Sequence, residues 1–271
     1  MTVSEFMTCL NLPAPTVYAL QSIPLPENHA ALKESFFLKT SLFEEFAEAD
    51  PAGLTVLKLY LNWAADTKAR YDRLGIPEEY FFNSMKDIPI WCDDYLSKHG
   101  TPGFQEWGWV GCSLRLEIIR IGRLQYGLSQ LSREVSCLGK SFPAGTPFLD
   151  VHIPAGEPLS PEAALASLNQ APGFYSKFFG RQFSLFHCHS WLLAPQLKEL
   201  LPENSRILQF QDLFCVYDTD TEEPQAEERI FGFHSEDPRN YPEETSLQKA
   251  AKQYLLSGKQ LPMGAGIRTI G

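Results

Sequence analysis

The chain has 271 residues, of which 44% are apolar, so it can bury one large core or two modest ones. Its formal net charge of −10 gives no electrostatic reason to bind phosphate backbones, so we expect no nucleic-acid partner. No apolar run approaches the roughly 20 residues that a membrane-spanning helix needs, and the first residues lack the features of a secretory signal. We therefore expect a cytoplasmic protein that has no membrane partner.

The first 120 residues show helical periodicity. In segment 35–50 the apolar side chains fall mostly on one face and the acidic ones elsewhere, as in an amphipathic surface helix. A second helix is predicted over 53–75, and a third over 77–100 with an interruption near Pro89. The pattern indicates a helical N-terminal half.

After Arg120 the periodicity changes to short segments rich in aromatic and branched residues, bounded by Gly, Pro or acidic turns. These are predicted as strands, over 123–134, 146–156, 181–194, 206–220, 228–234 and 264–271. Helices are predicted between them, over 158–172, 194–204 and 246–258. The first of these helices has Ser160 as its cap and Pro161 at its first position. This order predicts a mixed sheet with helices on its faces, and hence an α+β fold.

The cysteines stand singly, with no Cys-x-x-Cys pair and no dense framework. They are Cys9, Cys92, Cys112, Cys137, Cys188 and Cys215. In a chain without a secretion signal, such isolated thiols are mostly reduced and buried. We therefore predict neither a structural disulfide nor a zinc site.

Four segments of the second half carry a resemblance to a known family. They are IRIGRLQYGL at 119–128, VHIPAGEPLSPEAALASLNQA at 151–171, FHCHSWLLAPQLKELLPENSRILQFQDLF at 186–214, and the terminal GAGIRTI. On these segments the chain resembles bacterial acyltransferase-domain proteins that join a helical N-acyltransferase N-terminal domain to a GNAT-like C-terminal domain. The resemblance implies a helical domain over 1–120, packed on a GNAT-like mixed-sheet domain with flanking helices over 121–271.

The resemblance also implies a function. Enzymes of the GNAT superfamily move an acyl group from coenzyme A to an amine. We therefore expect an acyltransferase that takes an acyl group from acyl-CoA to a small-molecule amine or similar acceptor, with no metal. The alternative is a GNAT-like fold without catalysis that binds a small ligand or another protein.

The GNAT superfamily binds pyrophosphate with a loop patterned Arg/Gln-x-x-Gly-x-Gly/Ala that opens a helix. The nearest segment here, GKQLPMGAG, has Gly264 and Gly266 but Leu261 at the Arg/Gln position, and it leads into a predicted strand. Other candidate cofactor-binding residues are Arg120, Arg123, Gln209 and Gln211. The two arginines suit ion pairs between the domains better than they suit binding of a phosphate or carboxylate, and the two glutamines equally suit the solvent-facing edge of a predicted strand.

The candidate catalytic residues lie in the stretch FSLFHCHSWLLAP, at 183–195, and on the predicted strand before it. They are His152, Cys188, His189 and Ser190. On a strand, His187 and His189 point to one side of the sheet while Cys188 and Ser190 point to the other. A crossover helix is predicted to lay the strand that carries His152 beside this one, so both would border one pocket at the strand ends.

Three interpretations of this stretch remain open. In the first, Cys188 is a core thiol and the histidines are hydrogen-bonded strand residues. In the second, a histidine is the general base of a pocket where Ser190 or Cys188 positions the acyl group. In the third, His187, His189 and His152 hold a metal, although no carboxylate or fourth ligand is evident.

Overall fold

The structure is a computed structural model, and it describes residues 2–137 and 139–270. Its contacts divide the chain into two compact units. Unit 1 comprises Met1–Ile121 and Pro154–Glu157, and unit 2 comprises Gly122–Ile153 and Pro158–Gly271. None of the helices in the described residues is long and apolar enough to cross a bilayer.

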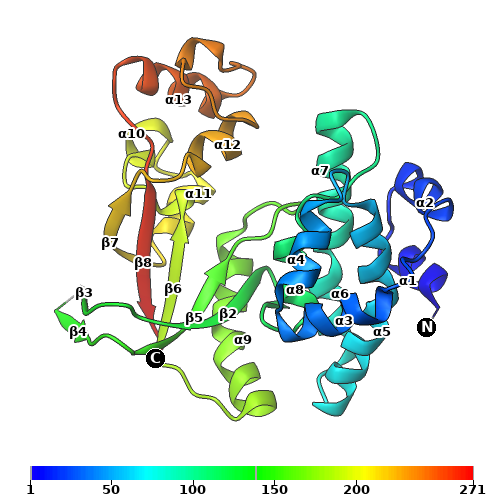
Figure 1. The fold of residues 1–271 in the computed structure, drawn as a ribbon. Coiled ribbons are helices and arrows are strands. Elements are labelled where there is room, and N and C mark those ends of the chain that lie inside the picture. The colour runs from blue at the N-terminus through cyan, green and yellow to red at the C-terminus, as the bar shows by residue number, and fades with distance from the viewer. Residues whose placement is uncertain (1, 138, 271) are drawn as a thin grey trace. The chain divides into compact units, whose positions relative to one another are not determined.

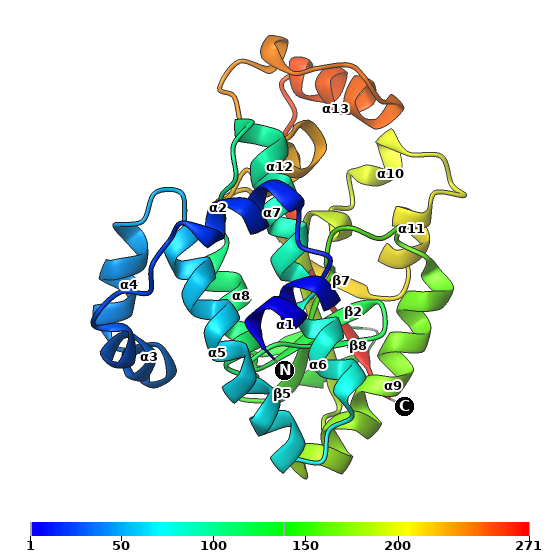
Figure 2. The same cartoon turned by 90° about the vertical axis from the view of Figure 1, so that its right-hand side faces the viewer.

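Unit 1 is helical, as predicted (Figure 1). Its elements are α1 (Val3–Cys9), α2 (Ala14–Gln21), α3 (His29–Leu38), α4 (Ser41–Glu48), α5 (Leu54–Arg73), α6 (Glu78–Met85), α7 (Asp87–His99), α8 (Trp107–Leu114) and the short strand β1 (Ile119–Ile121). The long helix α5 lies among the other helices of the unit (Figure 2). Its Tyr60 and Trp63 pack against Phe36 and Phe43, with ring centroids 5.2–5.8 Å apart. This aromatic cluster forms part of the buried core of the unit.

One predicted helix, over residues 35–50, is broken in the structure. The chain turns between α3 and α4 because Lys39 adopts a left-handed conformation with φ 56°. The Ser35 hydroxyl then accepts a hydrogen bond from the backbone N–H of Phe43 at 2.9 Å, which satisfies a donor at the start of α4.

Unit 2 is a mixed sheet with flanking helices (Figure 1), so the predicted α+β class is confirmed. Its elements are β2 (Leu124–Gln130), β3 (Val135–Cys137), β4 (Lys140–Phe142), β5 (Pro147–His152), α9 (Pro161–Phe179), β6 (Leu185–Ser190), η1 (Trp191–Leu193), α10 (Leu197–Leu200), α11 (Arg206–Gln211), β7 (Cys215–Asp220), α12 (Gln225–Phe231), η2 (Pro238–Asn240), α13 (Ser246–Leu256) and β8 (Met263–Thr269). Within the unit the strands lie in the order β2-β5-β6-β8-β7, and β3 and β4 form a separate hairpin. Strands β5 and β6 are parallel, while the pairs β2–β5, β6–β8 and β8–β7 are antiparallel.

The two faces of this sheet differ in chemistry. Helix α9 covers one face, where the Tyr175 hydroxyl donates to the carbonyl of Tyr126 at 2.8 Å. Residues paired in register share a face, so Asp150 of β5 and His187 of β6 lie together on the opposite face. We call this opposite face the site face; its residues on the parallel strands are Phe148, Asp150, His152, Leu185, His187 and His189.

The strand predicted over 206–220 is confirmed only from Cys215, where β7 begins, and the strand predicted over 228–234 is wrong. The first region contains helix α11, whose start is capped by Ser205, which accepts from the backbone N–H of Ile207 at 3.3 Å. The second is largely helix α12, which buries Ala226 and Ile230 one turn apart and ends at Gly232 with φ 88°. Short apolar segments of this kind do not distinguish helix from strand by periodicity.

Helix α9 confirms one predicted end and corrects the other. Ser160 caps it by accepting from the backbone N–H of Ala163 at 3.3 Å, and Pro161 is its first residue. The helix does not stop at Pro172 but continues to Phe179, where Gly180 ends it with φ 62°. A crossover of this length joins β5 to β6, as the parallel pairing requires.

The prediction of six reduced thiols is wrong at two positions. Cys137 and Cys215 form a disulfide, with Cα atoms 6.4 Å apart. Strands β3 and β7, which carry these residues, lie side by side. A separation of 78 residues in the sequence gives no sign of this proximity. The remaining cysteines are free.

Candidate functional site

Strands β5 and β6 separate towards their carboxyl ends. Among the described residues, their parallel register ends at the pair Asp150 and His187. Both strands nevertheless continue, since β5 stays paired with β2 as far as His152 and β6 stays paired with β8 as far as Ser190. Figure 1 shows the arrowheads of β5 and β6 lying apart. We call the opening between residues 151–152 and 188–190 the fork.

Asp150 bridges two histidines at the base of the fork. Its Oδ1 lies 3.4 Å from Nδ1 of His187, and its Oδ2 lies 3.3 Å from Nε2 of His152. Burial alone would raise the pKa of Asp150, but the hydrogen bonds with His152 and His187 outweigh it and hold the pKa well below its usual range. Asp150 is therefore a carboxylate at neutral pH.

Tyr217 of β7 extends this network. Its hydroxyl lies 3.1 Å from Nε2 of His187. If Nδ1–H of His187 donates to Asp150, then Nε2 accepts from the tyrosine hydroxyl, and both ring nitrogens are engaged. His187 is therefore poorly placed to take a proton from a substrate.

His189 is the most accessible imidazole on β6, with 43% of its side chain exposed. Its Nε2 lies 2.7 Å from Oδ2 of Asp220, at the end of β7. Its Nδ1 has no hydrogen-bond partner among the residues that the structure describes. With the Nε2 proton donated to Asp220, the Nδ1 lone pair is available to accept a proton.

Cys188 and Ser190 point to the other side of the strand, so the predicted alternation is confirmed. Cys188 is fully buried, and burial raises the pKa of its thiol well above the usual value. The Ser190 hydroxyl accepts from the backbone N–H of Leu192 at 3.2 Å and caps η1. For these two side chains the geometry favours the first interpretation, in which they serve packing and local structure.

The two candidate cofactor-binding arginines are held by protein groups. Nη2 of Arg120 lies 3.1 Å from Oε1 of Glu157, and Nε of Arg123 donates to the carbonyl of Pro158 at 3.2 Å. Their part in binding an acyl donor stays a prediction.

Gln209 and Gln211 lie on helix α11, so the expectation that they share one face of a strand is wrong. Gln209 is exposed, whereas Gln211 is buried and donates through Nε2 to the carbonyl of Ala194 at 2.8 Å. On a helix, side chains two positions apart point to different sides of the axis, so Gln209 and Gln211 do not share a face. Any contact of either glutamine with a cofactor stays a prediction.

The glycines of GKQLPMGAG lie on β8 and not in a loop that opens a helix. Gly264 pairs with Ser190, and Gly266 pairs with Cys188. A Cβ atom at Gly264 would stand 2.3 Å from the carbonyl oxygen of Leu193, so glycine is needed there for close packing.

Three residues of the site were not predicted from the sequence, namely Asp150, Tyr217 and Asp220. The Asp-x-His spacing at 150–152 was the available signal for the first, because residues two apart on a strand share a face. Asp220 belongs to an acidic stretch that is typical of a solvated loop. Its contact with His189 depends on β7 lying two strands away from β6, which no local pattern shows.

Within the described ranges 2–137 and 139–270, no group of three His, Cys, Asp or Glu side chains could hold a metal ion. The third interpretation therefore has no support from the geometry.

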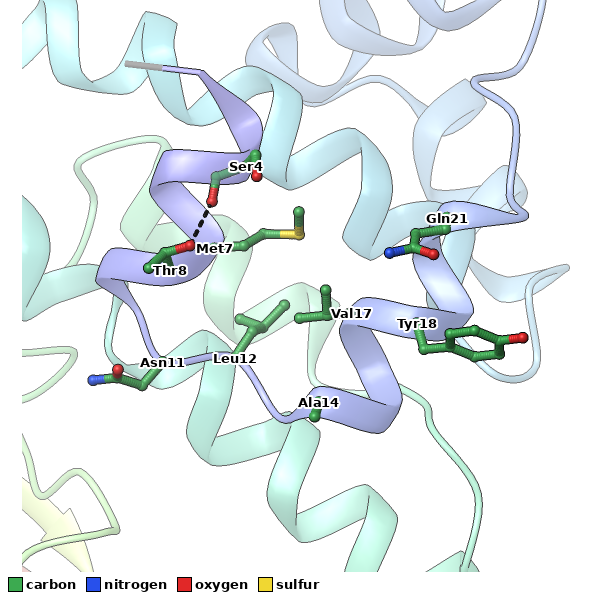
Figure 3. A pocket seen from close by; sticks show the side chains of 9 residues that line it. All are labelled: Ser4, Met7, Thr8, Asn11, Leu12, Ala14, Val17, Tyr18 and Gln21. Carbon is green, nitrogen blue, oxygen red and sulfur yellow. Dashed lines mark hydrogen bonds between the residues drawn. The ribbon is translucent and has the colours of Figure 1, made fainter.

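A pocket of about 410 Å³ lies in unit 1 between α1 and α2 (Figure 3). It is lined by Ser4, Met7, Thr8, Asn11, Leu12, Ala14, Val17, Tyr18 and Gln21. These residues include no carboxylate, imidazole, thiol or cation. The pocket therefore offers no group suited to proton transfer near neutral pH.

The comparisons with known families decide the assignment. The model of the GNAT-like C-terminal domain matches residues 118–268. The chain belongs to this GNAT-like family. The model of the N-acyltransferase N-terminal domain matches residues 1–116, so both parts of the resemblance are confirmed. A comparison with curated protein sequences found no match.

Solved structures of acyltransferases share this GNAT-like architecture. One, in complex with decanoyl-CoA and teicoplanin, has 22% sequence identity and a TM-score of 0.79 over 99% of this chain and 88% of its own. Another, in complex with decanoyl-CoA, has 24% identity with the same TM-score and coverage. A mutant acyltransferase in complex with octanoyl-CoA has 22% identity, again with a TM-score of 0.79 over 99% and 88% of the two chains. At these identities the likeness establishes the fold.

Proposed function

We propose that this chain transfers an acyl group from acyl-CoA to an amine. The observation that carries the proposal is the fork between β5 and β6, which is flanked by His152 and His189 inside a GNAT-like domain. Ligands of open α/β sheets bind outside the carboxyl ends of parallel strands, and the fork is such a place. The complexes of similar acyltransferases with decanoyl-CoA and octanoyl-CoA support the choice of donor.

The fork suits an extended donor with amide groups. Where the β5–β6 ladder ends, the backbone groups of the two strands that would have paired face the opening. The pantetheine arm of coenzyme A contains two amides and can hydrogen-bond to such groups as an added strand does. This placement brings the thioester to the level of His152 and His189.

His189 is the proton acceptor in this proposal. The amine nitrogen attacks the thioester carbonyl, a backbone N–H of the fork stabilises the oxyanion, and Nδ1 of His189 takes the proton that the nitrogen loses. The C–S bond then breaks, and CoA leaves as a thiolate that is protonated by the imidazolium or by water. Asp220 holds the His189 ring through Nε2 and so leaves Nδ1 free to take the proton.

Transfer is direct, without an acyl-enzyme intermediate on Cys188 or Ser190. A nucleophile must reach the thioester carbonyl, and both side chains lie on the face opposite the imidazoles. The raised pKa of Cys188 further disfavours the thiolate that would attack.

The acceptor and the domain limits are finer parts of the proposal. We infer an amine as acceptor because enzymes of the GNAT superfamily acylate amines and this chain has the GNAT-like domain. A complex of a similar acyltransferase contains teicoplanin, so the acceptor can be larger than the small molecule that the sequence suggests. We place the two domains over 1–120 and 121–271.

The role of His189 is tested by kinetics. With octanoyl-CoA as donor and a panel of amines that includes teicoplanin, release of the CoA thiol measures turnover. His189→Ala should lower kcat by about 10²-fold or more, because general-base assistance is typically worth about 10²–10⁴-fold. The matched control is His29→Ala, an exposed histidine at the start of α3, which should keep wild-type rates.

Two outcomes would reject parts of this proposal. Unchanged kcat in His189→Ala would remove His189 as the base. Failure of the wild-type protein to release CoA with any acceptor, together with tight binding of a small ligand, would favour a non-catalytic GNAT-like binding module.

A further inference from the structure

We propose that Asp150 is the positioning residue of the fork, because its carboxylate fixes the ring orientation and the proton position of both His152 and His187. The proposal rests on the proposed function in one respect, namely that His152 lines the site of acyl transfer. The other part of the proposal, that Asp150 sets the orientation and the proton position of both rings, depends only on the geometry of the fork.

The place of Asp150 in the sheet is the first argument. Asp150 and His187 form the last pair of the parallel register before β5 and β6 separate. One carboxylate oxygen contacts His187 across the strands, and the other contacts His152 further along its own strand. The carboxylate therefore joins the two strands at the point where the backbone ladder ends.

The second argument is chemical. A carboxylate only accepts hydrogen bonds, so each imidazole must present an N–H to it. This requirement places the proton of neutral His187 on Nδ1 and that of neutral His152 on Nε2. The tautomer of a histidine is set in this way by the partner of one ring nitrogen.

The groups around Asp150 are consistent with a carboxylate held between two imidazoles. His152 stands on its own strand, His187 and the buried Cys188 on β6, and Tyr217 on β7. On β2 the residue opposite is Gly127, which has no charge. The two imidazoles are the groups whose hydrogen bonds and charge favour the ionised carboxylate, against the effect of burial.

The decisive substitution is Asp150→Asn, which keeps the shape but replaces one acceptor oxygen with an NH₂ donor. The amide accepts from one imidazole N–H and opposes the other, so at least one of the two histidines must change tautomer or turn away. In the full-length protein without ligand, nitrogen-15 NMR of the histidine rings reports the protonated nitrogen directly. We expect Nδ1–H on His187 and Nε2–H on His152 in the wild type, and a change in at least one ring in Asp150→Asn.

Kinetics gives the functional counterpart. Asp150→Asn should lower kcat by about 10- to 100-fold, because the ring of His152, which lines the fork, is no longer fixed, although the base His189 keeps its partner Asp220. The KM for octanoyl-CoA should change less. Asp150→Glu should recover part of the loss because it restores two acceptor oxygens. The control is Asp72→Asn, an exposed carboxylate paired with Lys68, which should leave kcat and both tautomers unchanged.

The outcomes separate this proposal from the proposed function. The positioning role would be overturned if the wild-type protein carried the proton on Nε2 of His187 or on Nδ1 of His152. It would also be overturned if both tautomers stayed the same in a folded Asp150→Asn variant. If Asp150→Asn does not fold, the wild-type tautomers and those of Asp150→Glu decide the question. Changed tautomers in a protein that shows no acyl transfer would leave the positioning role in place and reject the proposed function.

Discussion

Asp150 keeps its charge at a position where burial alone would favour the neutral acid. The hydrogen bonds with His152 and His187 reverse that preference, so the folded state holds the pKa of this carboxyl below the value it has in the unfolded chain. Because this pKa is lower in the folded state than in the unfolded chain, the stability of the fold depends on pH. The charged Asp150 stabilises the fold at pH values above the unfolded pKa, and this contribution is lost as pH falls.

Acid unfolding of Asp150→Asn tests this linkage. The free energy of unfolding, measured with urea, should be lower in the variant than in the wild type at pH 7. The difference in free energy of unfolding between wild type and variant should narrow as pH falls below about 4, where the carboxyl of the unfolded chain begins to bind a proton. The reason is that a protonated Asp150 resembles asparagine. A gap that stays constant from pH 7 to pH 3 would show that Asp150 does not titrate with a depressed pKa.

The places of some of these residues could be predicted from the sequence and those of others could not, for a physical reason. The period of two along a strand placed His187 and His189 on one side and Cys188 on the other, and a crossover helix brought His152 alongside. Asp220 reaches His189 across β8, the strand that lies between β6 and β7, so that contact depends on the order of strands in the sheet.

At the scale of elements, the β3–β4 hairpin shows how a distant contact shapes the site face. Val135 of the hairpin belongs to a buried cluster with Phe148, Leu185 and Ile267, which are neighbours of the imidazoles on that face. The Cys137–Cys215 disulfide fastens the hairpin to β7, the strand that carries Tyr217 and Asp220. The buried cluster and the disulfide therefore both hold the hairpin beside β7.

Removal of this disulfide should lower stability measurably. Cys137→Ser together with Cys215→Ser should reduce the free energy of unfolding by about 2–4 kcal/mol under non-reducing conditions, because the bond closes a long loop and so restricts the unfolded chain. Cys9→Ser, at an exposed free thiol, is the control and should have little effect. Alkylation of the denatured, unreduced protein followed by mass spectrometry should modify four thiols. Six modified thiols would restore the expectation from sequence that every cysteine is reduced.

The helices were the most predictable elements where their ends carried clear signals. Ser160 and Pro161 marked the start of α9, and Gly100 marked the end of α7 with φ 69°. Segments 206–214 and 228–234 were misassigned because their aromatic and branched side chains suit a strand, while burial on one helical face decides the outcome. Tertiary packing thus overrode the local preference.

At the scale of the whole molecule, the sequence predicted the succession of a helical half and a sheet-containing half, and the two family models match residues 1–116 and 118–268. The fork could not be predicted in the same way. Its existence depends on where the ladder between two strands distant in the sequence ends, which no local pattern in the sequence shows. The proposed acyl transfer depends on the fork more than on any other feature of the molecule.

Hydrogen exchange measured by mass spectrometry, with and without octanoyl-CoA, tests directly whether acyl-CoA occupies the fork. Backbone amides that gain hydrogen-bond partners exchange more slowly, so the measurement reports the bound segment without an assumed acceptor. We predict slower exchange in peptides covering 148–153 and 185–191, and no change in peptides covering 3–21, which include the α1–α2 pocket. Unchanged exchange at the fork, or protection confined to residues 3–21, would contradict the account.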